Sequence, residues 1–200
     1  MSLLYGGKYD YQTKSYTFEQ FLEFSNLPEN KNMRFEFIYG YIYAMDSPAP
    51  NHSRIVQFIM SKLCPYLLDK KCEPFIDLGI HFKQKLRTDV LYPDIIVNCD
   101  PSRIKETHCA GTPEFILEVV SPTTYVDDYN LKKDYYLKNG AKEYWVVDHY
   151  KSQITAVTPK DTRIFTFSDT IPVGVLEDLS IDLCELSQFL ESSCFAESSE

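Results

Sequence analysis

Residues 115–120, with the sequence FILEVV, constrain the fold more than any other segment of the chain. Side chains of an extended strand alternate between two faces, and here both faces are apolar apart from Glu118. A strand that is apolar on both sides is usually buried on both sides, which requires further layers of structure above and below its sheet. We therefore predict a buried strand at 115–120, with Glu118 as a carboxylate in the interior of the protein.

The other segments predict helices and strands in a mixed order. Apolar residues with helical spacing indicate helices over residues 17–26, 52–68 and about 127–139, and a short final helix from about Cys184. The expected N-cap is Thr17 for the first helix, Asn51 or Ser53 for the second, and Asp127 or Asp128 for the third. Alternating residues indicate a hairpin over 34–45 around Tyr39-Gly40, strands at 75–82, 92–97 and 143–147, and an outer hairpin of 154–157 and 163–167. This order predicts an α/β (α+β) fold in which helices pack on a mixed β-sheet. It contains no G-x-G-x-x-G or P-loop motif, which argues against nucleotide-binding folds.

Length and composition predict one globular domain. The 200 residues are 44% hydrophobic and 24% charged, which suits a single well-buried core. We assign residues 17–190 to the domain, 1–16 to an N-terminal extension and 191–200 to a disordered tail. The chain does not open with a basic segment followed by an apolar one, and no apolar run is long enough to span a bilayer. We therefore expect a soluble cytoplasmic protein with no membrane partner.

Net charge and cysteine content set two further expectations. The net charge of -9 argues against a nucleic-acid partner, because phosphate contacts normally need a basic surface, although a metal site also requires clustered acids. The six cysteines, at 64, 72, 99, 109, 184 and 194, include no C-x-x-C pair, so we expect free thiols in a reducing cytosol. Metal ligation by His108 and Cys109, with Cys99 nearby, is the alternative, but the usual zinc-site spacing is absent.

A second acid repeats the environment of Glu118. Residues 92–97, YPDIIV, place Asp94 alone among apolar neighbours in a short strand that opens on Pro93. An unpaired buried carboxylate is costly, and a cation beside it removes that penalty. Mg2+ takes oxygen ligands, often one or two carboxylates with water and phosphate. If the two strands are neighbours, Asp94 and Glu118 form a metal site. The alternative is that each acid lies at a strand end and meets solvent or a basic partner.

Three further polar residues are candidates for the same site. Glu36 has apolar neighbours in the predicted hairpin, where the alternative is an ion pair with Arg34. Lys132 follows Asp128 by one helical turn, and it either forms a surface pair with that residue or points towards the metal to stabilise an attacking hydroxide. His52 opens a predicted helix, where a histidine is more often a cap or a surface group than a general base.

Five ordered blocks of sequence resemble one protein family. They are RFEFIYGYIYAM, SPAPNHSRI, YPDIIV, FILEVVSPTT and D-x-x-x-K-x-x-x-Y-x-x-x-G-x-x-E-Y-W-V-V-D, and the match runs from about Thr17 to Asp148. They resemble the Uma-type family of bacterial restriction endonucleases, a branch of the PD-(D/E)XK nuclease superfamily. The resemblance implies a restriction-endonuclease-like fold, with a central mixed sheet flanked by helices, and Mg2+-dependent phosphodiester hydrolysis.

The resemblance also implies a metal site. Pro93-Asp94 matches the superfamily's P-D, Glu118 matches its second acid, and Glu36 matches the acid of the upstream block. The resemblance thus implies that Asp94, Glu118 and the carbonyl of Val119 hold Mg2+, with Mn2+ as a possible substitute. Glu36 would hold a second metal ion or a bound water.

One position departs from the superfamily. A lysine is expected two residues after the second acid, and this chain has Val120 there. The family's own pattern places a lysine in the next helix, where Lys132 matches it, and a long flexible side chain can reach the same place from another element. Lys132 would then orient the attacking water, and the general-base role of His52 rests on the same resemblance.

The resemblance implies an endonuclease acting on nucleic acid, with DNA as the expected substrate. A homodimer is expected, because cutting both strands often uses two copies. Two alternatives stay open. A binding module that kept the fold and lost the chemistry is favoured by the displaced lysine and the acidic total charge. A metal-dependent hydrolase of small phosphoesters would use the same acids and would fit the charge better.

Overall fold

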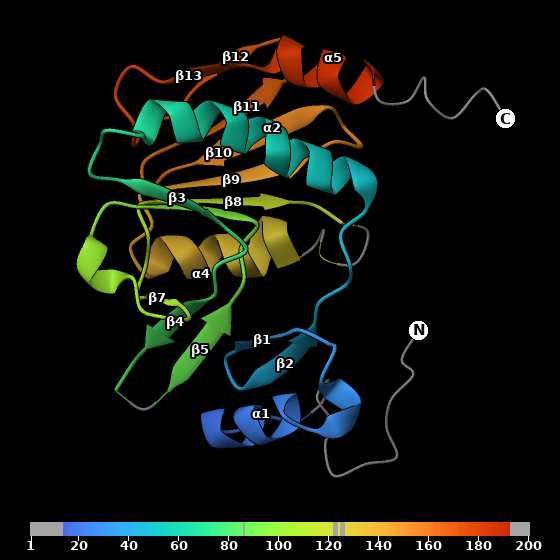
Figure 1. The fold of residues 1–200 in the computed structure, drawn as a ribbon, viewed down its shortest axis with the longest axis vertical. Helices are drawn as coiled ribbons and strands as arrows, with labels where there is room; N and C mark the ends of the chain where they lie inside the picture. The colour runs from blue at the N-terminus through green and yellow to red at the C-terminus, as the bar shows by residue number, and fades with distance from the viewer. Residues whose placement is uncertain (1–13, 86, 122–123, 125–126, 193–200) are drawn as a thin grey trace, which may run out of the picture.

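The computed structural model describes residues 14–85, 87–121, 124 and 127–192. Residues 1–13 of the predicted extension and 193–200 of the predicted tail lie outside this part. The described chain forms a six-stranded sheet, a five-stranded sheet and a two-stranded sheet, with the six-stranded sheet above the five-stranded one in Figure 1. The predicted mixed fold with flanking helices is confirmed. No helix in the described ranges is long and apolar enough to cross a membrane.

The six-stranded sheet has the order β11-β10-β9-β8-β6-β3. Its strands are β3 (Glu73–Ile76), β6 (Ile95–Asn98), β8 (Phe115–Val119), β9 (Glu143–Asp148), β10 (Gln153–Val157) and β11 (Thr162–Thr166). The five-stranded sheet has the order β2-β1-β5-β4-β7. Its strands are β1 (Phe35–Ile38), β2 (Tyr41–Ala44), β4 (Ile80–Lys83), β5 (Thr88–Leu91) and β7 (Cys109–Ala110). The two-stranded sheet pairs β12 (Thr170–Pro172) with β13 (Ser180–Asp182).

The run at 115–120 supplies β8, an interior strand of the six-stranded sheet, as predicted. It pairs antiparallel with β6 and parallel with β9, and all five of its residues are buried. Its odd-numbered residues pack in a core with α2 (Pro50–Leu67) and α5 (Leu183–Ser192). On the other face, Ile116 packs in a second core with α4 (Lys133–Lys138) and the five-stranded sheet. Both faces of the strand are therefore covered.

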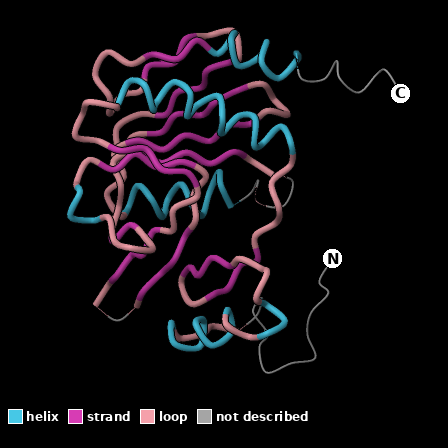
Figure 2. The backbone as a smooth tube through the Cα atoms, in the orientation of Figure 1, coloured by secondary structure: helices cyan, strands magenta, loops and turns pink. Residues whose placement is uncertain are grey.

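The five-stranded sheet carries the first helix, α1 (Phe18–Ser25), through aromatic contacts. The Phe21 and Phe37 rings stack with centroids 4.8 Å apart. Thr17 is the predicted N-cap, and it forms a capping box with Gln20, whose side chain accepts a hydrogen bond from the cap backbone N–H. The β2–α2 connection then runs as a loop from this lower part of the molecule to the upper part (Figure 2).

Two predicted helix starts differ from the structure. α2 begins at Pro50, whose fixed φ suits the first helical position, and its N-cap Ala49 makes no side-chain cap bond because alanine has no side-chain acceptor. The predicted helix at 127–139 begins with a π-helical turn, η3 (Asp128–Lys132), before α4. Short 3-10 turns, η1 (Pro28–Asn30) and η2 (Pro101–Arg103), complete the helical elements of the described ranges.

The single strand predicted at 75–82 is wrong, because the chain divides there between the two sheets. β3 ends at Ile76 and β4 starts at Ile80. Between them Asp77 takes a left-handed conformation, with φ of 59°, which aspartate tolerates better than most residues. Gly79 lies against the Tyr92 ring, where an added Cβ would come within 2.7 Å of a ring carbon. The break sends β3 to the six-stranded sheet and β4 to the five-stranded one.

The expectation of free thiols is wrong for two of the six cysteines. Cys72 and Cys99 form a disulfide. β3 and β6 pair antiparallel with Glu73 opposite Asn98, so the residues just outside that pair face each other across the strands. Cys64, Cys109 and Cys184 are free. Since Cys99 is held in the disulfide, it is not available as a third metal ligand beside His108 and Cys109.

Candidate active site

β6 and β8 place Asp94 and Glu118 opposite each other. The two strands are antiparallel neighbours, with Ile95 opposite Leu117. Asp94 directly precedes β6 and Glu118 follows Leu117, so the same register sets the two acids across from each other. Both line one cavity of about 500 Å3. The neighbouring strands that a two-carboxylate site requires are therefore present.

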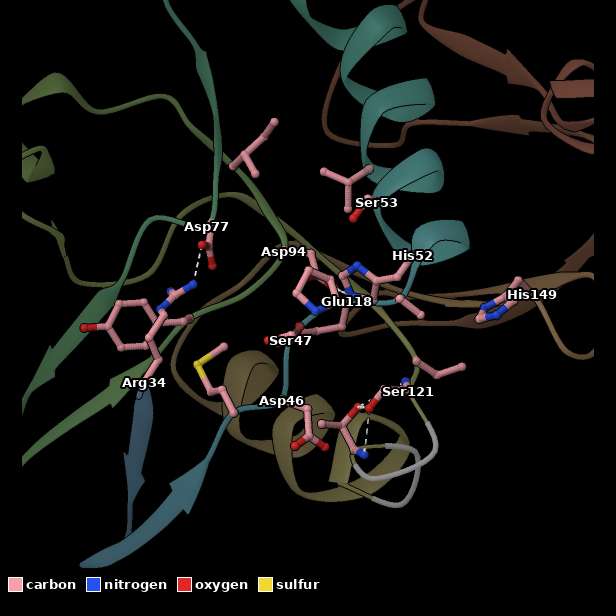
Figure 3. A pocket seen from close by; sticks show the side chains of 18 of the residues that line it. Arg34, Asp46, Ser47, His52, Ser53, Asp77, Asp94, Glu118, Ser121 and His149 are labelled. Carbon is pink, nitrogen blue, oxygen red and sulfur yellow. Dashed lines mark hydrogen bonds and ion pairs between the residues drawn. The ribbon is translucent and has the colours of Figure 1, made fainter. Parts of the chain in front are cut away.

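The cavity is formed where several elements end. The β2–α2 connection, the first turns of α2, the ends of β3, β8 and β9, and η3 all contribute to its lining. In Figure 3, Asp94, Glu118 and His52 lie in the centre of the view, with Arg34 and Asp77 to one side and His149 to the other. The predicted acids thus occupy the middle of the cavity, and its two sides are built by residues that the sequence did not single out.

Glu118 points from β8 towards η3 and α4. Its Oε1 atom accepts hydrogen bonds from Lys132 Nζ at 3.1 Å and from the Tyr136 hydroxyl at 3.0 Å. Burial raises the pKa of Glu118 well above its usual range, against the lowering effect of the Lys132 charge, and Asp128 and Asp94 add to the increase. One lysine therefore does not fully compensate the negative charge around this carboxylate.

Lys132 is buried among carboxylates, with only 6% of its side chain exposed. Its Nζ lies 3.1 Å from Glu36 Oε2, 3.1 Å from Glu118 Oε1 and 3.6 Å from Asp128 Oδ1. Burial lowers the pKa of Lys132, but these three carboxylates raise it by more than burial lowers it. The ammonium group therefore has a pKa well above its usual value. The alternative of a surface pair with Asp128 is wrong, and the structure brings Lys132 to Glu118 from the next helix.

Glu36 joins the same group from β1. Besides Lys132, its carboxylate accepts the backbone N–H of Tyr92 at 2.9 Å. The alternative partner in the sequence, Arg34, forms its ion pair with Asp77 instead. Glu36 is therefore placed beside Glu118 through their shared lysine, although it comes from the other sheet.

Asp94 is held by two donors at one oxygen. Its Oδ2 accepts the backbone N–H of Val119 at 2.7 Å and lies 3.1 Å from His52 Nε2. Burial lowers the pKa of His52, but the hydrogen bond and charge of Asp94, with Asp128 and Asp77, outweigh it and raise the pKa overall. The predicted His52 is thus brought to the site, where it orients Asp94.

Asp128 belongs to the site and was predicted only as a helix cap or a surface partner. It is 1% exposed, and Thr124 donates a hydrogen bond to its Oδ2 at 2.6 Å. Burial raises the pKa of Asp128 to about 6, against the lowering effects of Lys132 and Thr124. The four-residue spacing to Lys132 was a visible signal, but spacing alone does not distinguish a buried pair from an exposed one.

The charges of this site favour an added cation. Four carboxylates, those of Glu36, Asp94, Glu118 and Asp128, share it with one buried ammonium group. Among the residues that the structure describes, no three His, Cys, Asp or Glu side chains are grouped to hold a metal ion. The ligands that these residues offer to a cation are single carboxylates, which would leave the rest of its coordination shell to water or phosphate.

Another buried acid has a different environment. Asp89 of β5 is fully buried, and its Oδ2 accepts the Tyr135 hydroxyl at 2.6 Å and Arg87 Nε at 2.8 Å. Its Oδ1 accepts the backbone N–H of Tyr39 at 3.1 Å. Asp89 is thus a structural acid with a cation and two other donors of its own, and it does not line the cavity.

Comparisons with known proteins identify the family. Residues 18–184 match the model of the Uma2 family, which is described as "Putative restriction endonuclease". The chain belongs to the Uma2 family. An uncharacterized protein of Synechocystis sp. is 31% identical over 118 residues, which are 58% of this chain and 61% of that protein. The match thus spans about three fifths of that relative's length.

A solved structure gives the fold. The crystal structure of a protein from Anabaena variabilis, described as "a putative nuclease belonging to DUF820", superposes with a TM-score of 0.71 at 24% identity. The match covers 87% of this chain and 98% of that one. The Uma2 chain therefore has the fold of that protein, with the mixed sheet and flanking helices that the ordered sequence blocks predicted.

Proposed function

We propose that this Uma2 protein is a metal-dependent endonuclease that hydrolyses phosphodiester bonds of nucleic acid, with DNA as the first substrate to test and Mg2+ or Mn2+ as the cofactor. The observation that carries the proposal is the lysine bonded to Glu118 opposite Asp94, at the bottom of a cavity with excess negative charge. The family and the fold support the reaction class, and this geometry supports the residues.

The residues of the chain would divide the work. Asp94 and Glu118, with the carbonyl of Val119, would hold the ion. A bound divalent ion lowers the pKa of a coordinated water and offsets phosphate charge. Three neighbouring carboxylates raise the pKa of Lys132, so its ammonium group stays protonated. It would therefore act as a hydrogen-bond donor to the attacking water or the phosphate oxygens rather than as a base. The Lys132 ammonium thereby offers the donor that Val120 cannot.

His52 and Glu36 would take supporting positions. His52 fixes Asp94 by the hydrogen bond that its Nε2 donates, and its other ring nitrogen, Nδ1, would accept the proton that the attacking water releases. Glu36 holds Lys132 in place and would bind a second ion or a water. The reaction consumes one water, breaks one P–O ester bond and leaves a phosphomonoester and a hydroxyl group. We also propose that the protein is cytoplasmic and forms a homodimer. Light scattering on the purified protein would detect the dimer.

The test is cleavage of labelled DNA and of a small phosphodiester such as bis(p-nitrophenyl) phosphate, with Mg2+, Mn2+ or EDTA. Cleavage is expected with either metal and not with EDTA, and Asp94→Ala should abolish it. Asp89→Asn is the matched control, because Asp89 is also a buried acid but lies outside the cavity. Unchanged cleavage by Asp94→Ala would remove Asp94 from the mechanism.

A second candidate function, a binding module without chemistry, is favoured by one observation. The Lys132 ammonium already pairs with Glu36 and Glu118, so these acids are partly neutralised without a metal. That module should bind nucleic acid equally well with Mn2+ and with EDTA and cleave none of the substrates above. Cleavage of the small diester alone would instead favour a hydrolase of small phosphoesters.

A further inference from the structure

We propose that the catalytic cavity takes a single, unstacked nucleic-acid strand rather than a duplex, and that bases stack on two pairs of side chains at its sides, one of a guanidinium on a ring and one of two rings. This inference rests on the proposed function and specifies its substrate class. It comes from three features of the cavity: the charge of its lining, its size and the residues on its two sides.

The lining carries more carboxylates than lysines and arginines. Among the described residues that line the cavity, Asp46, Asp77, Asp94 and Glu118 are acidic, Arg34 and Lys132 carry the full positive charges, and His52 and His149 complete the titratable groups. Arg34 is paired with Asp77, and Lys132 is buried among its own carboxylates. Proteins that grip duplex DNA do so through many phosphate contacts from lysine and arginine, and this lining does not supply them. Contacts to bases must therefore contribute a larger share of the binding.

One side of the cavity offers a flat surface on which a base can stack. The Arg34 guanidinium lies over the Tyr92 ring, with its central carbon 4.6 Å from the ring centroid. Gly79 supports the Tyr92 ring from below, since no side chain can stand between them. The Arg34 side chain is 44% exposed, and a guanidinium plane is one of the surfaces on which an unpaired base stacks.

The opposite side carries the second pair. His149 and Tyr150 follow β9, and their rings lie 4.0 Å apart at the centroids. Tyr150 lines the cavity and is 61% exposed, so its ring is accessible to a base. The neighbouring Lys151 pairs with Asp148 at 3.4 Å. In Figure 3, Arg34 and His149 lie on opposite sides of Asp94 and Glu118, so the two pairs flank the candidate catalytic centre.

The size of the cavity agrees with one strand. A volume of about 500 Å3 lies in the range of sites that enclose a small molecule, and it suits a nucleotide or a short stretch of extended strand. A strand that crosses it with one base on the Arg34–Tyr92 pair and another on Tyr150 would present the intervening phosphate to Asp94 and Glu118. Every base has a flat face, so this mode does not require a particular sequence.

The experiment compares oligonucleotides of about 12 residues as single-stranded DNA, single-stranded RNA and duplex DNA of the same sequence. Cleavage is measured with Mn2+, and binding is measured by fluorescence anisotropy at about 50 and 200 mM salt. Single strands should bind and be cleaved at least about tenfold better than the duplex. With two phosphate contacts or fewer, affinity should fall less than about tenfold between the two salt concentrations. The DNA and RNA arms decide which single strand is preferred.

Tyr150→Ala tests the stacking directly. It should raise the KM for the single strand about tenfold and leave kcat within a factor of a few, because its ring binds a base away from the reacting atoms. Tyr41→Ala is the matched control, since Tyr41 is an exposed tyrosine of β2 outside the cavity. Duplex preference, or an unchanged KM for Tyr150→Ala, would overturn the inference while leaving the nuclease proposal intact. Lack of any metal-dependent cleavage, even of the small diester, would instead overturn the proposed function.

Discussion

Asp89 and Glu118 are both acids in buried strands, and the sequence around each gives little sign that their roles differ. Asp89 meets Arg87, the Tyr135 hydroxyl and a backbone N–H, and it lies away from the cavity. Glu118 shares one ammonium group with two other carboxylates and lies at the cavity. A buried acid is therefore a poor signal for a site by itself, whereas buried acids that outnumber their cations beside an opening are a strong one.

The largest expected effect comes from removing the shared cation. Lys132→Met leaves three carboxylates buried without a counter-charge and should lower the free energy of unfolding by about 3–5 kcal/mol at about pH 8. Denaturation with urea measures it. Lys133→Met is the matched control, because Lys133 is adjacent and partly exposed and forms an ion pair with the exposed Asp134. This substitution should change stability by less than about 1 kcal/mol.

The same variant can be rescued in a way that separates charge from packing. Lowering the pH to about 5.5 protonates buried carboxylates and should restore part of the stability that Lys132→Met loses. A loss below about 1 kcal/mol, or a loss with no dependence on pH, would mean that the ammonium group does not balance this cluster.

Substitution of Asp89 should lower stability without affecting the candidate site. Asp89→Asn leaves Arg87 without its charged partner and weakens the hydrogen bond from Tyr135, so it should cost about 2 kcal/mol of stability. Catalysis and metal binding should be unchanged in the folded variant. Thermal unfolding with and without Mn2+ measures both effects, and a lost Mn2+ effect would contradict the structural role.

Asp128 predicts a pH dependence of known sign. Its folded pKa of about 6 lies above the usual value of 3.8 for this side chain, so the folded state takes up a proton first as the pH falls. Without metal, this group therefore costs stability above about pH 6, and the cost disappears as the pH falls towards 4. Asp128→Asn should remove a pH-dependent contribution of about 2 kcal/mol. Urea titrations between these pH values, compared with the wild type, measure it, and an equal slope in both proteins would contradict the assignment.

The smallest expected effect has the reverse sign and lies in the five-stranded sheet. Burial and the charge of His108 lower the pKa of His81 to about 4, and the two rings stack with centroids 3.9 Å apart. A histidine with a depressed pKa loses stability as the pH falls from 6.5 towards 4. His81 is only partly buried, so we expect only about 1 kcal/mol. His81→Phe should remove that loss in the same titrations, and an undiminished acid sensitivity would contradict it.

The fold could be predicted where a local sequence pattern allows only one structure. The double apolar alternation at 115–120 required a strand covered on both faces, and β8 has that environment. The break at Asp77 was not predictable, because alternation continues through it and only the left-handed backbone ends the strand. The Cys72–Cys99 disulfide depends on the pairing of β3 with β6, which the sequence does not specify.

The site was predictable residue by residue but not as an arrangement. Family resemblance and strand burial named Asp94, Glu118, Glu36, Lys132 and His52, and the structure places them together at or beside one cavity. Asp128 was missed because its burial depends on how η3 packs against β8. The aromatic sides of the cavity were missed because they come from segments far apart in the chain.

The most direct test of the account is titration of Mn2+ into the purified protein by calorimetry. The wild type should bind Mn2+, Asp94→Asn should not, and Asp89→Asn should bind as the wild type does, because only Asp94 lies opposite Glu118 at the cavity. Asparagine keeps an acceptor for Val119 and His52, so the substitution removes charge more than structure. A folded wild type that binds no Mn2+, or an Asp94→Asn variant that binds it with unchanged affinity, would contradict the central claim.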